Sequence, residues 1–103
     1  MRSLACLLYL LASTATAAEL SPVQQQGLER LVLQDCGSCH GMTLKGGLGP
    51  DIRAQTLADW EPDALRMVIL DGVEGTPMPP WRPLLSEDEV NWIVNYLKKG
   101  GTQ

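Results

Sequence analysis

The sequence predicts an all-α domain. Three segments begin with helix-start signals, at Ser21, Pro62 and Ser86, and apolar residues recur at helical spacing after each of them. The alternation of apolar and polar residues that marks a half-buried strand is absent from the sequence, as are internal repeats. At 103 residues the chain is long enough for one domain and too short for a second core of ordinary size.

The first predicted helix starts at Pro22, behind the N-cap residue Ser21, and runs toward Cys36. Its apolar face is formed by three residues at helical spacing: Leu28, Leu31 and Val32. Residues 41–58 follow and contain four glycines and one proline, so we expect them to form a loop.

The second predicted helix starts at Pro62 and stops at Gly72. It is rich in apolar residues, and we expect it to be short and largely buried. Residues 75–83 contain four prolines, which cannot continue a helix or donate to a sheet, so a stiff and extended segment is predicted there.

Residues 86–89 form a capping box that opens the last predicted helix. This helix closes at Lys98, Lys99 and Gly100. Four apolar residues share one of its faces: Val90, Ile93, Val94 and Leu97.

The composition excludes several classes of partner. The net charge is −4 and the isoelectric point is about 4.7, the wrong sign for binding phosphate backbones or anionic lipids, so we expect no nucleic-acid partner. Hydrophobic residues make up 45% of the chain, but aromatic residues only 5%, and phenylalanine is absent. Something other than stacked phenylalanines must therefore fill the core.

Residues 1–18 have the features of a cleavable signal peptide. A positively charged start precedes a short apolar run at residues 4–12, and small residues follow in the pattern that signal peptidase needs. The run has nine residues, whereas about 20 are needed to span a bilayer, so we expect no membrane span in the mature protein. Cleavage would remove Cys6 and leave one exported domain, residues 19–103.

The mature domain then keeps two cysteines, Cys36 and Cys39, and the sole histidine, His40, follows them directly. This C-x-x-C-H pattern is the attachment site of a c-type haem. Thiols at positions i and i+3 of a helical turn reach the two vinyl groups on one porphyrin edge, and the next imidazole points at the iron. The mature chain has 85 residues, and the core of so short a chain stabilises little by itself. One covalent haem c would therefore also complete the core.

Three other uses of the cysteines fit the sequence less well. A thioredoxin-like redox pair needs βαβ patterning around it, and none is visible. A structural zinc ion needs four ligands, and the mature chain offers two cysteines and one histidine. A disulfide across two intervening residues would stabilise little because its loop is so short.

The iron has a second axial position, for which thioether sulfur is a common ligand in electron transfer. Met78 is the favoured candidate, because prolines at positions 77, 79 and 80 preset its backbone and lower the entropy cost of ligation. Met67 lies on a predicted helix, where methionine usually fills the core. Met42 follows His40 too closely to reach the opposite face of the ring, and an open or displaced position is the remaining alternative.

These motifs resemble, in their order, a class I monohaem cytochrome c, and they cover nearly all of the mature chain. The resemblance is carried by residues 36–40, by Gly49-Pro50, by the run Met78-Pro79-Pro80-Trp81 and by the closing amphipathic helix. It implies the class I cytochrome c fold, with three to four helices wrapped around one haem.

The same resemblance assigns roles to individual residues. It implies that His40 is the proximal ligand, that Met78 is the distal ligand, and that the Pro50 carbonyl accepts the imidazole N–H. It also implies that three residues lie near the haem propionates: Arg53, Trp60 and Trp81. The ordinary alternatives are a solvated arginine and tryptophans that belong to the core.

Residues 69–86 together resemble the small periplasmic cytochromes c encoded in denitrification nir gene clusters, beside the haem cd nitrite reductase. This implies a periplasmic, monomeric electron carrier that donates electrons to that nitrite reductase and is not an enzyme. The alternatives are a haem-bearing assembly factor for the reductase, or a carrier to another periplasmic oxidoreductase. A peroxidase would need an open iron and a polar acid or base beside it, but the sole histidine is already used.

Few charges surround the expected haem edge. Apart from His40, the only charged side chains in residues 36–50 and 75–85 are Lys45 and Arg82. We expect these two cations to give weak steering toward the redox partner. The docking itself is expected to use a ring of apolar side chains: Met42, Leu44, Leu48, Pro79 and Pro80.

Overall fold

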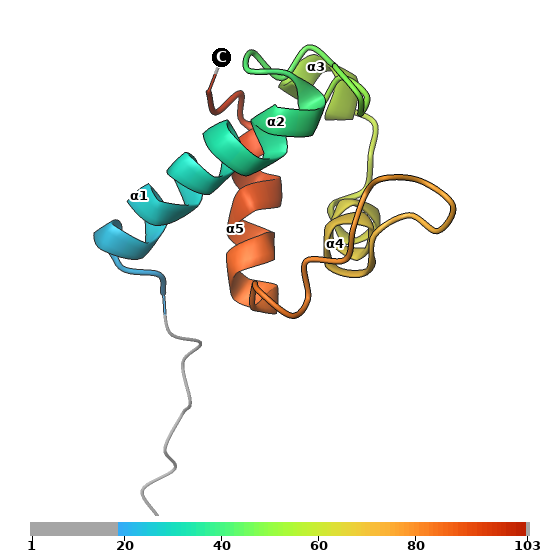
Figure 1. The fold of residues 1–103 in the computed structure, drawn as a ribbon. Helices are drawn as coiled ribbons and strands as arrows, with labels where there is room; N and C mark the ends of the chain where they lie inside the picture. The colour runs from blue at the N-terminus through green and yellow to red at the C-terminus, as the bar shows by residue number, and fades with distance from the viewer. Residues whose placement is uncertain (1–18, 103) are drawn as a thin grey trace, which may run out of the picture.

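The computed structural model describes residues 19–102, and the expected signal peptide of residues 1–18 lies outside that range. Every regular element within the described residues is helical, which confirms the predicted all-α fold. In Figure 1, α5 (Glu87–Lys98) occupies the centre, with α1 (Pro22–Leu31) on one side and α4 (Pro62–Asp71) on the other. Helix α5 contacts both of them, and the fold is organised around it. A helix long and apolar enough to cross a membrane is not found in residues 19–102.

The first helix is continuous over residues 22–40, where α1, one π turn (Val32–Cys36) and α2 (Gly37–His40) follow one another. It starts as predicted, because the Ser21 hydroxyl accepts a hydrogen bond from the Gln24 amide (3.2 Å) and the Gln24 side chain accepts one from the Ser21 amide (2.8 Å). The sequence does not predict the π turn. An extra residue in a turn rotates everything after it by about 100°, so the π turn sets the direction in which the end of the helix presents its side chains.

The prediction that residues 41–58 form only a loop is wrong for α3 (Ala54–Leu57). This helix has no side-chain cap, and four residues are too few to be helical alone. It is stabilised from outside, because Leu57 is buried in the core and Lys98 of α5 donates hydrogen bonds to the carbonyl oxygens of Leu57 (2.9 Å) and Trp60 (2.6 Å). These contacts bridge about 40 residues of sequence, and local patterns do not report them.

Helix α4 starts at Pro62 and ends before Gly72, as predicted. Gly72 has a positive φ of 68°, which a residue with a side chain rarely adopts. The expectation that the helix is largely buried is wrong: only Leu65 and Leu70 are buried, and Met67 is 59% exposed. One face of α4 packs on α5, and the polypeptide leaves the opposite face uncovered.

Helix α5 opens with the predicted capping box. The Ser86 hydroxyl accepts a hydrogen bond from the Glu89 amide (3.1 Å), and the Glu89 carboxylate accepts one from the Ser86 amide (3.0 Å). Its predicted apolar face is fully buried, and it joins residues of the first helix and of the loops in one aliphatic core, which includes Leu28, Val32, Val90, Ile93, Val94 and Leu97.

The hydrogen bonds of Lys98 predict a measurable contribution to stability. Lys98→Met should lower the free energy of unfolding by about 2 kcal/mol, because hydrogen bonds to a charged group typically contribute about 1.5–3 kcal/mol. Lys99→Met is the matched control, since it removes the same charge from the same helix end at an exposed position and should cost less than about 0.5 kcal/mol. Thermal denaturation followed by circular dichroism compares the two, and equal losses would contradict the role given to Lys98.

Candidate haem site

Two cysteines and a histidine meet at the end of the first helix, in and beside α2 (Figure 1). Cys36 and Cys39 are free thiols at positions i and i+3, and both are partly buried. Residues at this spacing lie on the same side of a helical turn. The two thiols therefore have the placement needed for two thioether bonds to one porphyrin edge.

The environment of Cys36 does not suit redox exchange. Burial raises the pKa of its thiol from 9.0 to about 11, and the adjacent Asp35 carboxylate adds to the rise. The thiol therefore stays protonated at neutral pH. A thioredoxin-like pair works through a thiolate with a lowered pKa, so the structure disfavours that use of the cysteines.

The imidazole of His40 is fixed in one orientation. Its Nδ1 lies 2.7 Å from the carbonyl oxygen of Pro50. Because a carbonyl oxygen can only accept, Nδ1 carries the proton in this contact, and Nε2 keeps its lone pair. A histidine held in this way is prepared for metal binding through Nε2.

Glycines let the following loop fold back over residues 36–40, which we call the attachment turn. The amides of Gly46 and Gly49 donate to the carbonyl oxygens of His40 (2.7 Å) and Cys39 (2.8 Å). Gly49 packs directly against the imidazole, and a β-carbon there would lie 2.7 Å from Cε1 of His40. The sequence predicts a loop here but not this packing, whose only sequence signal is the ten-residue spacing between His40 and Pro50.

Met78 lies in the segment that connects α4 to α5, and hydrogen bonds hold its backbone on both sides. Its amide donates to the Thr76 hydroxyl (3.3 Å), which itself donates to the Val73 carbonyl (2.7 Å). Its own carbonyl accepts from the Val73 amide (3.2 Å). Met78 is half-buried, whereas Met67 and Met42 are 59% and 68% exposed. Hydrogen bonds therefore add to the support that the prolines provide.

The three residues expected near the propionates have different surroundings. Arg53 binds Asp51 through two nitrogens, with Nη2 2.7 Å from Oδ2, and these hydrogen bonds hold the pKa of Asp51 well below its usual range. Trp60 is 49% exposed, and Trp81 is half-buried against the core. The guanidinium of Arg53 is therefore not simply solvated, and a propionate would have to share it with Asp51.

Two members of the expected docking surface are placed differently from the prediction. Leu44 is fully buried, because the chain turns there through a positive φ of 60° and directs this side chain into the core. Arg82 is paired with Asp71 and Glu87, so it is not a free cation. The remaining members and Lys45 are exposed, including Met42 (68%) and Leu48 (75%).

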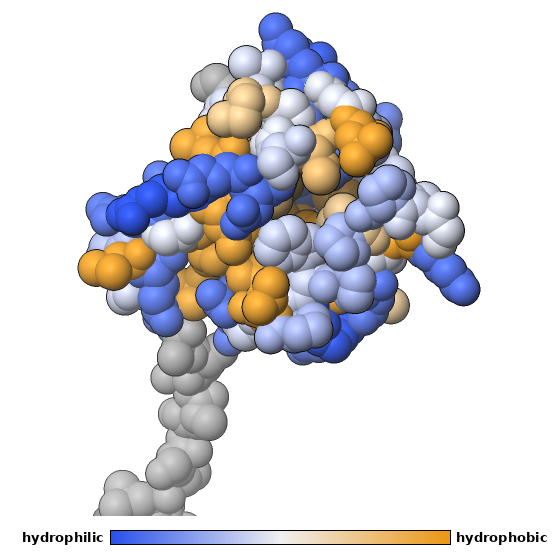
Figure 2. All heavy atoms as spheres, in the orientation of Figure 1, coloured by the Kyte–Doolittle hydropathy of each residue, from blue (hydrophilic) through white to orange (hydrophobic). Residues whose placement is uncertain are grey.

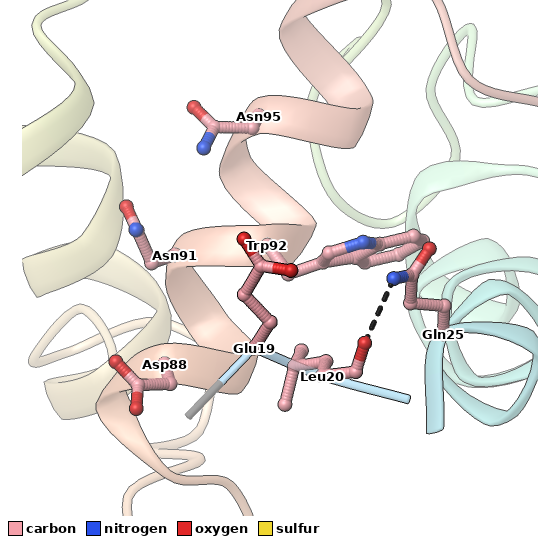
Figure 3. Close-up of a pocket in the computed structure, with 7 residues that line it drawn as sticks. All are labelled: Glu19, Leu20, Gln25, Asp88, Asn91, Trp92 and Asn95. Carbon is pink, nitrogen blue, oxygen red and sulfur yellow. Dashed lines mark hydrogen bonds between the residues drawn. The ribbon is translucent and has the colours of Figure 1, made fainter. Parts of the chain in front are cut away.

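The surface in Figure 2 shows hydrophobic residues emerging in separate places between hydrophilic ones, without a continuous apolar belt on this face. A groove of about 520 Å³ lies between residues 19–25 and α5 (Figure 3). Carboxylates and amides gather around Trp92 in it, and the Gln25 side chain donates to the Leu20 carbonyl (3.0 Å). No thiol, imidazole or thioether lines this groove, so it is separate from the attachment turn.

Helices packed on α5, with a C-x-x-C-H turn at the end of the first helix, define the class of protein, a class I monohaem c-type cytochrome. Residues 23–97 match the family described as cytochrome c oxidase, cbb3-type, subunit III, and the chain belongs to this family. The resemblance to the small cytochromes of nir clusters is also confirmed by the relatives of the chain.

Cytochrome c55X of Paracoccus denitrificans is 52% identical over 103 residues, with both chains covered completely. The solved structure of the c-type cytochrome NirC is 43% identical with a TM-score of 0.78, and the match covers 81% of this chain and 98% of that one. The solved structure of dihydro-heme d1 dehydrogenase NirN in complex with DHE is 32% identical with a TM-score of 0.66. That match covers 73% of this chain and 16% of that one.

The residues at the attachment turn fit a covalent haem c. They supply two thiols at the required spacing and an imidazole with an available Nε2. When bound, the haem supplies an iron that changes its oxidation state by one electron. The chain is therefore a c-type electron-transfer cytochrome, and its similarity to cytochrome c55X and NirC links it to the nir cluster.

The packing of Gly49 predicts that even one methyl group disturbs the site. Gly49→Ala in the holoprotein should lower the free energy of unfolding by about 1–3 kcal/mol, as overpacking commonly does, and should alter the visible spectrum because the His40 ring must move. Gly27→Ala is the control: a β-carbon at Gly27 contacts nothing within 4 Å, so this change should leave the spectrum unchanged. Identical spectra for Gly49→Ala and the parent protein would contradict the tight contact with the ring.

Proposed function

We propose that this cytochrome carries electrons on an iron ligated by Nε2 of His40 and Sδ of Met78, and that it donates them to haem cd nitrite reductase. The observation that carries the proposal is the support of Met78. Residues 75–80 contain no titratable side chain, and backbone hydrogen bonds and prolines hold the thioether-bearing residue there. Thioether ligation is typical of electron-transfer haems and favours the reduced iron.

The same arrangement argues against catalysis of bond chemistry. A haem peroxidase needs an accessible iron and a general acid or base beside it. In the proposal the sole histidine is used as a ligand, with its Nδ1 engaged by Pro50, and the distal segment offers a sulfur instead of a titratable group. We therefore assign no enzymatic activity to the chain.

The partner and the location rest on the relatives and on the leader-like N-terminus. The similarity to cytochrome c55X and NirC supports a role beside the nitrite reductase of denitrification. We propose that residues 1–18 are removed on export and that residues 19–103 act as one monomeric domain in the periplasm. We also propose that three residues lie near the haem propionates: Arg53, Trp60 and Trp81.

Docking on the reductase is proposed to use a small apolar surface, defined by four exposed residues: Met42, Leu48, Pro79 and Pro80. Arg82 no longer counts as a steering charge, because Asp71 and Glu87 neutralise it. Lys45 is the cation that remains in residues 36–50 and 75–85, the segments around the expected haem edge. Docking through so few charges should depend only weakly on salt.

Stopped-flow mixing of the reduced holoprotein with the nitrite reductase tests the proposal. Leu48→Glu should slow electron transfer by about tenfold or more, equivalent to about 1.4 kcal/mol, while the spectrum stays unchanged. Val23→Glu is the matched control, because Val23 is as exposed (77% against 75%) and lies at the other end of the first helix. Raising the salt concentration should reduce the rate only modestly.

Three outcomes would contradict this account. Equal slowing by Val23→Glu would remove the docking surface, and a steep salt dependence would mean that charges dominate docking. Absence of oxidation by the reductase at any salt concentration would remove the proposed partner.

A second candidate function is assembly of the nitrite reductase, and one similarity favours it. Dihydro-heme d1 dehydrogenase of Pseudomonas aeruginosa is 35% identical over 69 residues, which cover only 14% of that protein. A dehydrogenase removes electrons from its substrate. This cytochrome resembles one part of the dehydrogenase and, as a separate protein, is a chemically suitable acceptor for those electrons. Nitrite reductase purified from cells that lack this cytochrome separates the roles: a full complement of haem favours electron donation, and incomplete haem favours assembly.

A further inference from the structure

We propose that the ion pair of Asp71 with Arg82 is a clasp that positions Met78 for the iron. The inference rests on the proposed function, in which Met78 is the axial ligand. Asp71 and Arg82 are positioning residues, because they act through the backbone of residues 72–81, which we call the Met78 loop.

The Met78 loop is closed at its base by backbone hydrogen bonds. The loop leaves α4 after Asp71, and where it returns the Trp81 amide donates to the Ile69 carbonyl (3.0 Å). The Arg82 amide donates to the Leu70 carbonyl (3.0 Å). These bonds satisfy carbonyl groups that a helix end leaves without partners, and they bring Arg82 beside the last turn of α4.

The side chain of Arg82 then joins three elements. Its Nε and Nη2 lie 2.9 and 3.0 Å from the two carboxylate oxygens of Asp71, a bidentate arrangement that fixes orientation as well as distance. Its Nη1 lies 3.4 Å from Glu87, the first residue of α5. One guanidinium therefore ties the end of α4 and the start of α5 to the returning limb of the Met78 loop.

A short path leads from the clasp to Met78. Gly72 follows Asp71 directly, and a β-carbon at Gly72 would lie 2.7 Å from the Met78 carbonyl oxygen. Val73 comes next, and its amide donates to that same oxygen. The backbone of Met78 therefore rests on the two residues after Asp71, so a shift of Asp71 moves the support of the ligand.

The local charges give the clasp its effect. Arg82 is the only basic residue in residues 72–86, and it is paired with two acids, Asp71 and Glu87. Asp71 also lies at the C-terminal end of α4, where the helix dipole disfavours a negative charge. Without Arg82, repulsion between Asp71 and Glu87 would separate the parts that the guanidinium joins.

Competition by added imidazole for the oxidised iron of the holoprotein tests the clasp. Asp71→Asn and Arg82→Gln should each tighten imidazole binding by about tenfold, because apparent affinity follows the population of the sulfur-free state. The sulfur-to-iron absorption band should weaken in parallel. Arg82→Lys keeps the charge and loses the bidentate geometry, so it should fold and still bind imidazole more tightly than the parent protein.

Two further variants sharpen the comparison. Glu74→Gln removes an exposed charge from the same loop, outside the ion pairs found among the described residues, and should leave imidazole binding unchanged. The double variant Asp71→Asn with Arg82→Gln should bind imidazole no more tightly than either single variant, because the pair acts as one unit.

Parent-like imidazole binding by both Asp71→Asn and Arg82→Lys would overturn the clasp. Met78→Ala separates this failure from failure of the proposed function, since it should abolish the sulfur band and bind imidazole more tightly than any clasp variant. If Met78→Ala instead keeps the band, the ligand assignment is wrong and the clasp is overturned with it.

Discussion

The hydrogen bond from Nδ1 of His40 to the carbonyl of Pro50 is the constraint on which the rest of the site depends. It selects one tautomer of the imidazole and leaves Nε2 available for a metal. It also requires the loop between the two residues to fold back over the attachment turn. Gly49 makes that close approach possible, because any side chain there would collide with the ring.

The fold supplies the two proposed axial ligands from segments that are stabilised independently. His40 ends the first helix, which packs on α5 through the aliphatic core. Met78 comes from the segment between α4 and α5, where prolines and backbone hydrogen bonds limit its movement. Ligands held in this way need little rearrangement when the iron gains or loses an electron, as preorganised sites generally do.

Local sequence signals predicted the helix starts well. The N-cap at Ser21, the proline at position 62 and the capping box at Ser86 act within three or four residues, so short patterns reveal them. The attachment turn was equally visible, because its chemistry depends on a fixed spacing within five residues. The apolar face of α5 also followed directly from its helical spacing.

The features that the sequence did not predict depend on contacts between distant residues. Helix α3 is stabilised by the burial of Leu57 and by Lys98, about 40 positions later, which donates to the carbonyl groups of Leu57 and Ala58 at the end of the helix. Arg82 looked like a free cation because Asp71 precedes it by eleven residues, and only the return of the chain brings them together. Leu44 lies in a glycine-rich stretch typical of an exposed loop, yet its backbone turns the side chain into the core.

Methyl NMR of the reduced holoprotein, labelled with 13C at the methionine methyl groups, tests the central claim most directly. A methyl group on an axial ligand lies over the porphyrin ring, and the ring current shifts its signal far upfield. The account predicts one such signal, which Met78→Leu removes and which Met67→Leu and Met42→Leu retain. Survival of the signal in Met78→Leu, or its loss in Met67→Leu, would contradict the assignment of Met78 as the axial ligand.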